Sequence, residues 1–412
     1  MNHFEAFKAR GFVKQLTDDE IAQKVNGDPM VFYVGFDPTA ASMHVGHFMT
    51  LMSMRMMQRF GHKPIVLLGG GTAVVGDPSG KSELRKMLTR EEIDQNANAL
   101  EKQFRRFFTV GDGPTDAVIL NNLDWLGPLN YLDFLRDIGT HFSVNRMLTY
   151  ESVKLRLEKG LTFLEFNYNL LQSYDFYHLA KNYGCVMQMG GDDQWGNIVS
   201  GIELVRRKLS KQAFGLTNPL ITTASGTKMG KTEKGAVWLD PEMTTPYDFY
   251  QYWVNVDDRD VGRFMRLFTD MEEEVIAELE VLQDAALNEA KARLAWEVTN
   301  LVHGKEEADN ARNAAKAAFS KDREITPDAD IPTVELPAAD LEASPQLVAV
   351  MGDTGICGSR GEAKRLVKGG GVSVNNKKIS SFDHALSPGD VDEYGQIIIR
   401  VGKKRFHRLK IV

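Results

Sequence analysis

The chain has 412 residues, of which 43% are hydrophobic and 25% charged, and its formal net charge is −7. These values are typical of a soluble globular protein with two or three domains. No stretch reaches the roughly 18 uncharged apolar residues of a membrane span, and segment 1–12 lacks the apolar core of a signal peptide. Only two cysteines occur, Cys185 and Cys357, so we expect no disulfide framework, no protein-bound metal and a cytoplasmic location.

The first half of the chain alternates strand-like and helix-like segments. Strands are expected at 31–36, 63–70, 117–122 and 186–191, and helices at 44–61 and 193–209. This alternation predicts an α/β domain over residues 1–244 with a doubly wound, Rossmann-like parallel sheet. Ligands of such sheets bind at the carboxyl ends of the strands, where the polar motifs of this chain lie.

The chain beyond residue 244 has a different pattern. Apolar residues at three-to-four spacing predict a helical domain over 245–320. Residues 321–344 contain three prolines and seven acidic residues without a lasting period, which indicates a linker. Residues 345–412 form a small α+β domain with 12 Lys/Arg and 6 Asp/Glu, against 37 and 50 in the rest of the chain. A basic tail on an acidic body predicts a polyanionic partner for the tail.

The segment GDPSGKS (76–82) resembles the end of a nucleotide-binding P-loop. A P-loop places four residues between its glycine and the Gly-Lys pair, but only three separate Gly76 from Gly80. The spacing therefore argues against a P-loop NTPase. Lys81 and Arg85 remain candidates for contact with an anion.

The segment GFDPTAASMHVGH (35–47) places two histidines at the start of a helix. His44 and His47 are three residues apart and lie on one side of the first turns. A helix N-terminus attracts anions, and two imidazoles there can donate to a phosphate. Gly46 is costly in an early helical turn unless some group must approach closely. The alternative is a chance pair of histidines.

The segment SGTKMGKT (225–232) is a glycine-containing loop with Lys228 and Lys231 three residues apart. Such a cationic loop suits a polyphosphate that must bind and then leave. The alternative is an ordinary solvated turn.

Taken together, H-x-G-H after the first strand and K-M-x-K-T after the last resemble class I aminoacyl-tRNA synthetases. The segments YVGFDPTA (33–40), GDPSGK (76–81), NNLDW (121–125), NYNLLQSYD (167–175) and GGDDQWGN (190–197) are similar to tyrosyl-tRNA synthetases of bacterial type. The resemblance covers nearly the whole chain. It implies activation of L-tyrosine by ATP, accompanied by Mg²⁺, to tyrosyl-adenylate and pyrophosphate, followed by transfer of tyrosine to the 3′ end of tRNA(Tyr). It also implies a homodimer with its interface near 145–166.

The resemblance assigns roles to individual residues of this chain. For tyrosine, it implies Tyr33 and Asp175 at the phenolic hydroxyl, Tyr168, Gln172 and Asp77 at the ammonium, and Gln194 at the carboxylate. For ATP, it implies Asp37, Thr39, His44, Gly46, His47, Thr50, Gly191 and Asp193, with Lys228, Lys231, Thr232, Lys81 and Arg85 at the phosphates. Asp175 also stands out by itself, because a carboxylate within an apolar helix is costly unless paired. Trp125 and Trp195 are expected to serve packing, and Asp192 is expected to add negative charge near the nucleotide.

The basic segment 359–379 resembles an S4-type RNA-binding module. Arg360, Lys364, Arg365 and Lys368 form one stripe along a predicted helix, and Arg400, Lys403, Lys404, Arg405 and Arg408 add charge from the final strands. Such a stripe fits the phosphates of folded RNA. By resemblance, the partner is the variable arm and anticodon stem of the tRNA.

Two other functions fit parts of this pattern. A tryptophanyl-tRNA synthetase shares the class motifs, but Tyr33 with Asp175 and the S4-like tail favour tyrosine. An RNA-binding protein that keeps the fold without the activity would lack some of His44, His47, Lys228 and Lys231, and all four are present.

Overall fold

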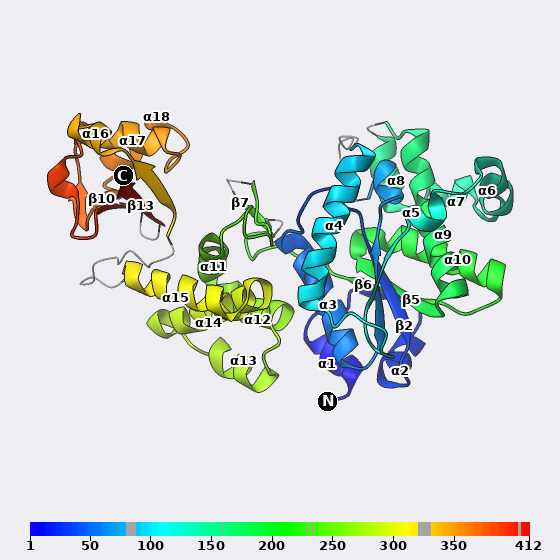
Figure 1. The fold of residues 1–412 in the computed structure, drawn as a ribbon. Coiled ribbons are helices and arrows are strands. Elements are labelled where there is room, and N and C mark those ends of the chain that lie inside the picture. Colours follow the sequence, from blue (N-terminus) through cyan, green and yellow to red (C-terminus); the bar gives the residue numbers. More distant parts are fainter. Residues whose placement is uncertain (80–87, 159, 228, 233–234, 320–330, 403–404) are drawn as a thin grey trace. The chain divides into compact units, whose positions relative to one another are not determined.

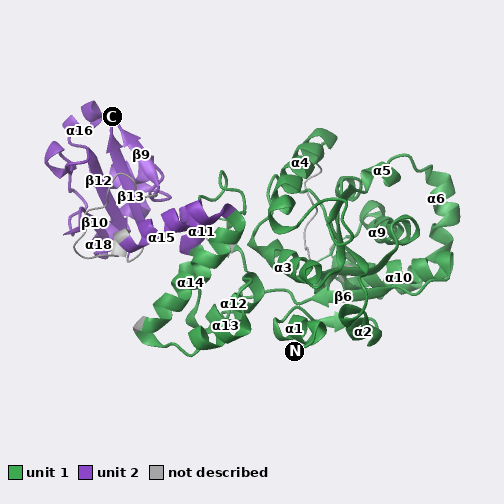
Figure 2. Ribbon diagram, turned by 60° about the horizontal axis from the view of Figure 1, so that its bottom comes forward, with its two compact units in different colours: residues 1–245, 252–302 green, residues 246–251, 303–412 purple. Residues whose placement is uncertain are grey.

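The computed structural model of the chain describes residues 1–79, 88–158, 160–227, 229–232, 235–319, 331–402 and 405–412. The chain divides into two compact units (Figure 2). The first contains residues 1–245 and 252–302, and the second contains residues 246–251 and 303–412. The domain boundaries expected at 244, 320 and 344 stay predictions.

The first unit is built on a six-stranded sheet with the order β1-β6-β5-β2-β3-β4. Its strands are β1 (Gln15–Leu16), β2 (Val31–Phe36), β3 (Lys63–Leu68), β4 (Val118–Asn121), β5 (Cys185–Gly191) and β6 (Phe214–Asn218). The strands from β6 to β4 run parallel, whereas β1 pairs with β6 in the antiparallel sense. The expected all-parallel sheet is therefore wrong at this edge, where a two-residue strand is too short to leave a sequence pattern.

Helices cover both faces of this sheet, as expected (Figure 1). α3 (Val45–Arg59) and α4 (Arg90–Phe107) lie on one side, and α9 (Phe163–Asn182) and α10 (Trp195–Leu209) lie on the other. All five residues of β6 and the last five of β3 are buried, which is typical of strands covered on both faces. The strands expected at 31–36, 63–70, 117–122 and 186–191 are confirmed to within two residues at each end.

Shorter elements complete the first unit. Its further helices are α1 (His3–Ala9), α2 (Glu20–Asn26), α5 (Leu123–Leu126), α6 (Tyr131–Asp137), α7 (Val144–Met147), α8 (Glu151–Leu157), α12 (Val261–Phe268) and α13 (Glu273–Glu280). A small hairpin pairs β7 (Lys231–Thr232) with β8 (Gly235–Ala236). α11 (Pro246–Val254) and α14 (Asp284–His303) contribute residues to both units.

The second unit contains α15 (Lys305–Phe319) and a five-stranded sheet with the order β11-β10-β12-β13-β9. Its strands are β9 (Thr333–Leu336), β10 (Val372–Val374), β11 (Lys377–Ile379), β12 (Gln396–Val401) and β13 (Arg405–Ile411), and its other helices are α16 (Ala338–Glu342), α17 (Leu347–Asp353) and α18 (Arg360–Lys368). β9 and α16 lie within the range expected as a linker, and residues 321–330 of that range lie outside the described residues. Within the described ranges, no helix is both long and apolar enough to cross a bilayer.

Candidate active site

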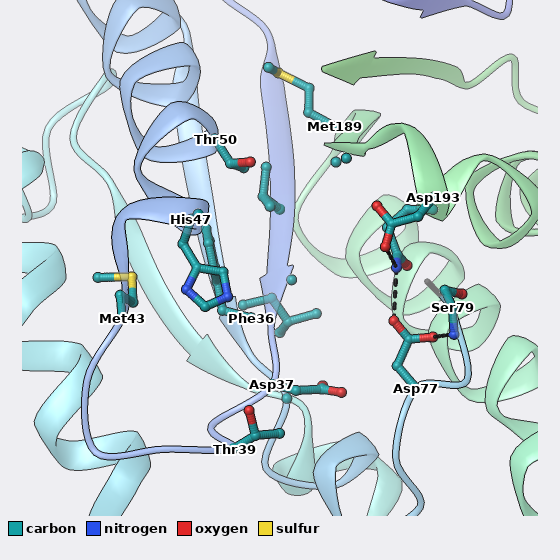
Figure 3. A pocket seen from close by; sticks show the side chains of 18 of the residues that line it. Phe36, Asp37, Thr39, Met43, His47, Thr50, Asp77, Ser79, Met189 and Asp193 are labelled. Carbon is teal, nitrogen blue, oxygen red and sulfur yellow. Dashed lines mark hydrogen bonds between the residues drawn. The ribbon is translucent and has the colours of Figure 1, made fainter. Parts of the chain in front are cut away.

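A cavity of about 530 Å³ lies where β2, β5 and β6 end and α3 begins. It gathers residues that are far apart in the sequence and that were expected at a substrate site: Tyr33, Asp37, Thr39, His44, Gly46, His47, Thr50, Asp77, Tyr168, Gln172, Asp175, Gly191, Asp193 and Gln194. In Figure 3, His47 and Thr50 lie on one side of the cavity, and Asp77 and Asp193 lie on the other.

Tyr33 and Asp175 form a buried polar part of this cavity. Tyr33 is 1% exposed and Asp175 is 2% exposed. The Tyr33 hydroxyl has no hydrogen-bond partner among the described residues, and burial together with the nearby Asp175 charge raises its pKa well above the usual range. Burial raises the pKa of Asp175 to about 7. A ligand hydroxyl placed here can both donate to the carboxylate and accept from the tyrosine.

Asp175 is held by two residues that the sequence did not identify. The Trp125 indole N–H donates to Asp175 Oδ1 at 2.8 Å, and the Asn122 amide donates to Oδ2 at 2.9 Å. Trp125 also stacks on His178, with ring centroids 4.2 Å apart. Trp125 is buried in the core and does not line the cavity as described, in keeping with the packing role expected of it, and its bond to Asp175 is a further contact that the sequence did not indicate. Both residues belong to the NNLDW motif, but the motif alone does not reveal that they hydrogen-bond to a residue about 50 positions later in the chain.

A chain of hydrogen bonds joins Asn122 to Asp37, across the cavity wall. Asn122 donates to Thr72 Oγ1 at 3.0 Å, and Thr72 donates to Asp37 Oδ1 at 2.8 Å. The Tyr168 hydroxyl donates to Asp37 Oδ2 at 3.0 Å. Tyr168 was expected near an ammonium group, and this bond leaves its hydroxyl oxygen able to accept while its hydrogen is held by Asp37.

Asp77 lies at the opposite wall, shown with dashed lines in Figure 3. Its Oδ1 accepts the Ser79 N–H at 2.8 Å, and its Oδ2 accepts from Gln194 Nε2 at 2.8 Å. Burial, and then the charge of Asp37, raise the pKa of Asp77 above the usual value. A second carboxylate close enough to raise the pKa of Asp77 makes this part of the cavity attractive to a cation, and an ammonium group fits this requirement.

The two histidines close the N-terminus of α3. His44 is the N-cap, and its Nδ1 accepts the Gly46 N–H at 3.0 Å. His47 Nδ1 accepts the His44 N–H at 3.3 Å, and the two rings stack with centroids 4.0 Å apart. Because each Nδ1 is an acceptor, the neutral rings carry their protons on Nε2. Each ring can therefore donate from Nε2 to a phosphate oxygen.

Gly46 and Gly230 allow close approaches at this helix end. A Cβ on Gly46 would lie 2.7 Å from Cε1 and 2.8 Å from Nδ1 of His44, so the group whose approach was expected is the His44 ring itself. Gly230 has φ +83°, and a Cβ on it would lie 3.0 Å from the Gly46 nitrogen. Gly230 is thereby brought against the helix that carries the histidines.

Asp192 does not lie in the described wall of the cavity. Its Oδ1 accepts from Gln15 Nε2 at 2.6 Å and from Thr217 Oγ1 at 2.8 Å. The carboxylate therefore links β1 and β6, and its expected effect on the charge near the nucleotide stays a prediction.

The described wall of the cavity carries four carboxylates, those of Asp37, Asp77, Asp175 and Asp193, and no Lys or Arg. The expected cations Lys81, Arg85 and Lys228 lie outside the described residues. Lys231 and Thr232 are described through their backbone, which pairs with β8.

The basic stripe of the second unit lies on α18. Its side chains Arg360, Lys364, Arg365 and Lys368 are exposed, while Ala363 and Val367 on the other face are buried. Arg360 forms an exposed ion pair with Asp353, and the ammonium groups of Lys364 and Lys368 lie 5.5 and 5.4 Å from the Phe382 ring centre.

The described basic residues of the final strands differ in exposure. Arg405 is exposed, whereas Arg408 is only 9% exposed and donates to Thr333 Oγ1 at 3.4 Å. Arg400 donates to Ser373 Oγ at 3.1 Å. Lys403 and Lys404 lie outside the described residues.

Comparison with known proteins covers both units. Residues 25–320 match the family described as tRNA synthetases class I (W and Y), and residues 326–409 match the tyrosine–tRNA ligase SYY-like C-terminal domain. A tyrosine–tRNA ligase of Acetivibrio thermocellus is 50% identical over 410 residues, covering 99% of both chains. One of Caulobacter vibrioides is 51% identical over 408 residues, covering 98% of this chain and 96% of its own length. The crystal structure of a C-terminally truncated Aspergillus nidulans mitochondrial tyrosyl-tRNA synthetase superposes with a TM-score of 0.69 and 31% identity, covering 77% of this chain and 94% of that one.

Proposed function

The chain belongs to the tyrosine–tRNA ligases, a family of class I tRNA synthetases, and from this membership we propose how its cavity performs the reaction. Tyrosine, ATP and tRNA are the substrates of this activity. The observation that carries the assignment of the site is the buried pair of Tyr33, whose hydroxyl has no partner among the described residues, and Asp175. A phenolic hydroxyl fits between them, and phenylalanine would leave both groups unpaired.

We propose that tyrosine binds with its two ends separated in the cavity. The phenol donates to Asp175 and accepts from Tyr33. The ammonium lies by Asp77, Tyr168 and Gln172, and the carboxylate by Gln194. A carboxylate oxygen of tyrosine attacks the α-phosphorus of ATP, the bond to pyrophosphate breaks, and tyrosyl-adenylate remains. A terminal ribose hydroxyl of tRNA then attacks the tyrosyl carbonyl and releases AMP, so no protein nucleophile is required.

The nucleotide is assigned to the α3 side of the cavity. His44 and His47 donate from Nε2 to phosphate oxygens, next to Asp37, Thr39 and Gly46. Thr50, Gly191 and Asp193 take the ribose, since a carboxylate can accept from both of its hydroxyls. Lys81, Arg85, Lys228, Lys231 and Thr232 stabilise the pyrophosphate as charge moves onto it.

We propose that Mg²⁺ enters with ATP. Mg²⁺ is typically held by phosphate oxygens, waters and one or two carboxylates. In the described part of the chain, no group of three or more His, Cys, Asp or Glu side chains is arranged as a metal site. Carboxylates of the cavity would therefore supply at most part of its coordination.

The test of the site is amino-acid-dependent exchange of labelled pyrophosphate into ATP, measured with each of the twenty amino acids and without tRNA. We expect exchange with tyrosine alone, and a Tyr33→Phe variant should lose discrimination against phenylalanine. Exchange with tryptophan would instead overturn the pocket assignment while keeping the chemistry.

We further propose that the sheet of the first unit is Rossmann-like and that the second unit is an S4-like RNA-binding domain. The support is the exposed stripe of Arg360, Lys364, Arg365 and Lys368 on α18, together with Arg405, Lys403 and Lys404 in the sequence. Basic side chains on one helix face fit the phosphates of a folded tRNA.

We propose that the protein is a cytoplasmic homodimer. Between 144 and 164, six apolar side chains are 36–70% exposed: Val144, Leu148, Leu155, Leu157, Phe163 and Leu164. An apolar face of this kind is typical of a subunit interface, and both cysteines are free thiols, which fits a reducing compartment. Replacing Leu155 and Phe163 by Asp should convert a dimer into a monomer in sedimentation velocity, and an unchanged sedimentation coefficient would refute this interface.

A further inference from the structure

Asp260 is a buried carboxylate that the proposed reaction does not use. It is 2% exposed and ends η4 (Asp258–Asp260), directly before α12. Its Oδ2 accepts the backbone N–H of Ala224 at 2.7 Å, and its Oδ1 accepts from Arg263 Nη2 at 2.7 Å. A buried carboxylate is costly unless its oxygens are satisfied. The Ala224 N–H therefore helps to satisfy the buried Asp260 carboxylate, and the same hydrogen bond holds the segment that precedes K-M-G-K-T in place.

Arg263 and Tyr252 hold the same segment at two more points. Arg263 Nη2 also donates to the carbonyl oxygen of Thr222. The Gly230 N–H donates to the Tyr252 hydroxyl at 3.1 Å. The bonds from Asp260 and Arg263 fix the start of the segment at Ala224 and Thr222, and the bond to Tyr252 fixes it at Gly230, six to eight residues later along the chain.

Helix α12, which follows Asp260 and carries Arg263, is itself anchored to α1. The Arg10 guanidinium, in α1's C-cap, donates to the carbonyl oxygens of Arg266, Thr269 and Met271 at the end of α12. On the other side, Gly230 lies against the α3 N-terminus, and its carbonyl accepts the Val237 N–H at 2.9 Å. The loop is therefore held between α12 and the helix that carries His44 and His47.

We propose that Asp260, Arg263 and Tyr252 are positioning residues that set where segment 221–232 presents its lysines to the phosphates of ATP. None of the three lines the cavity as described, so they act through the loop rather than on a substrate. The proposal rests on the proposed function, in which Lys228 and Lys231 stabilise pyrophosphate. It predicts that adenylate formation from ATP depends on these three residues, whereas tyrosine binding does not.

The experiment uses the full-length protein with Asp260→Asn and Tyr252→Phe. Asparagine loses the charge that holds Arg263 and offers the Ala224 N–H only a neutral oxygen, which is a weaker acceptor than the carboxylate, and phenylalanine removes only the hydroxyl of Tyr252. Arg259→Gln is the matched control, because it breaks an exposed ion pair with Asp257 in the same turn without touching segment 221–232. Pyrophosphate exchange is measured against ATP and against tyrosine, tyrosine Kd by equilibrium dialysis, and amide hydrogen exchange at Ala224 and Gly230.

We expect Asp260→Asn and Tyr252→Phe each to lower kcat/KM for ATP about tenfold or more, with tyrosine Kd within about twofold of wild type. Amide exchange should accelerate at Ala224 in Asp260→Asn and at Gly230 in Tyr252→Phe, and neither site should change in Arg259→Gln. Equal losses for ATP and tyrosine, or unchanged amide exchange, would overturn the proposal. A wild-type protein without tyrosine-dependent exchange would instead overturn the proposed function, while the amide data still report whether the three residues hold the loop.

Discussion

Asp175 keeps a carboxyl group at a buried position because Trp125 and Asn122 each donate to one of its oxygens. Neither donor carries a charge, so desolvation prevails and the pKa of Asp175 rises to about 7. Burial likewise raises the pKa of Tyr33, on β2, so that its hydroxyl keeps its proton. The proposed specificity of the site for a phenol would therefore depend on residues that the substrate is not expected to touch.

Trp125→Phe tests this dependence. The phenylalanine ring can keep the stack on His178 but removes the N–H that Asp175 Oδ1 accepts. Loss of a donor to a buried carboxylate should lower kcat/KM for tyrosine about tenfold. Trp296→Phe on α14 is the control, and pyrophosphate exchange is the measurement. Equal activity of the two variants would show that the indole N–H is not needed.

The pKa of Asp175 also predicts a pH dependence of tyrosine binding. The phenol donates to the ionised carboxylate, and the protonated acid increases as pH falls below about 7. Tyrosine affinity should therefore be full above this pH and fall about tenfold per pH unit below it. Equilibrium dialysis between pH 5.5 and 8.5 gives the profile. Asp175→Asn should lose this dependence, and a variant with the wild-type profile would assign it to another group.

At the N-terminus of α3, the same histidine side chains cap the helix and line the cavity. His44 and His47 satisfy backbone N–H groups of the first turn through Nδ1, which caps the helix. Gly46 is required for this arrangement, since the His44 ring folds over it.

Gly46→Ala separates the two roles of this turn. Alanine favours a helix over glycine by about 1 kcal/mol, but its Cβ would displace the His44 ring. We expect tyrosyl-adenylate formation to slow about tenfold or more, without a comparable loss in the free energy of unfolding. Gly139→Ala is the control, because its Cβ would meet only Leu135, at 3.8 Å. Rapid-quench kinetics and urea unfolding measure the two effects, and an unaltered rate would contradict the role given to His44.

Elements were more predictable than their contacts. β2, β3 and β5 are apolar runs between turn residues, and such runs identify a strand locally. The partners of Asp175 come from a segment about 50 residues away. They meet it because β4 pairs with β3 in a register that brings Asn121 opposite Leu68. That register is a property of the assembled sheet, as is the antiparallel edge at β1.

At the scale of the whole molecule, chemistry and RNA binding are assigned to separate units. A variant ending at residue 319 removes all five strands of the second sheet, including β9. Because the cavity lies in the first unit, tyrosine-dependent pyrophosphate exchange should stay within about twofold of the full chain. Charging of tRNA should fall about 100-fold or more, since the phosphate contacts of α18 are lost. Aminoacylation assays measure the second effect, and charging at the full rate would remove the RNA role from this unit.

The four carboxylates of the described cavity wall have a consequence for the order of substrate addition. A zwitterion that presents its ammonium to Asp77 is attracted to this wall, whereas a triphosphate is repelled by it until its own counter-charges are in place. We therefore expect tyrosine to bind the protein in the absence of ATP. Once the ammonium group has neutralised part of the negative charge of the wall, we expect the triphosphate to bind. Mg²⁺ and the lysines proposed to stabilise pyrophosphate then balance its charge.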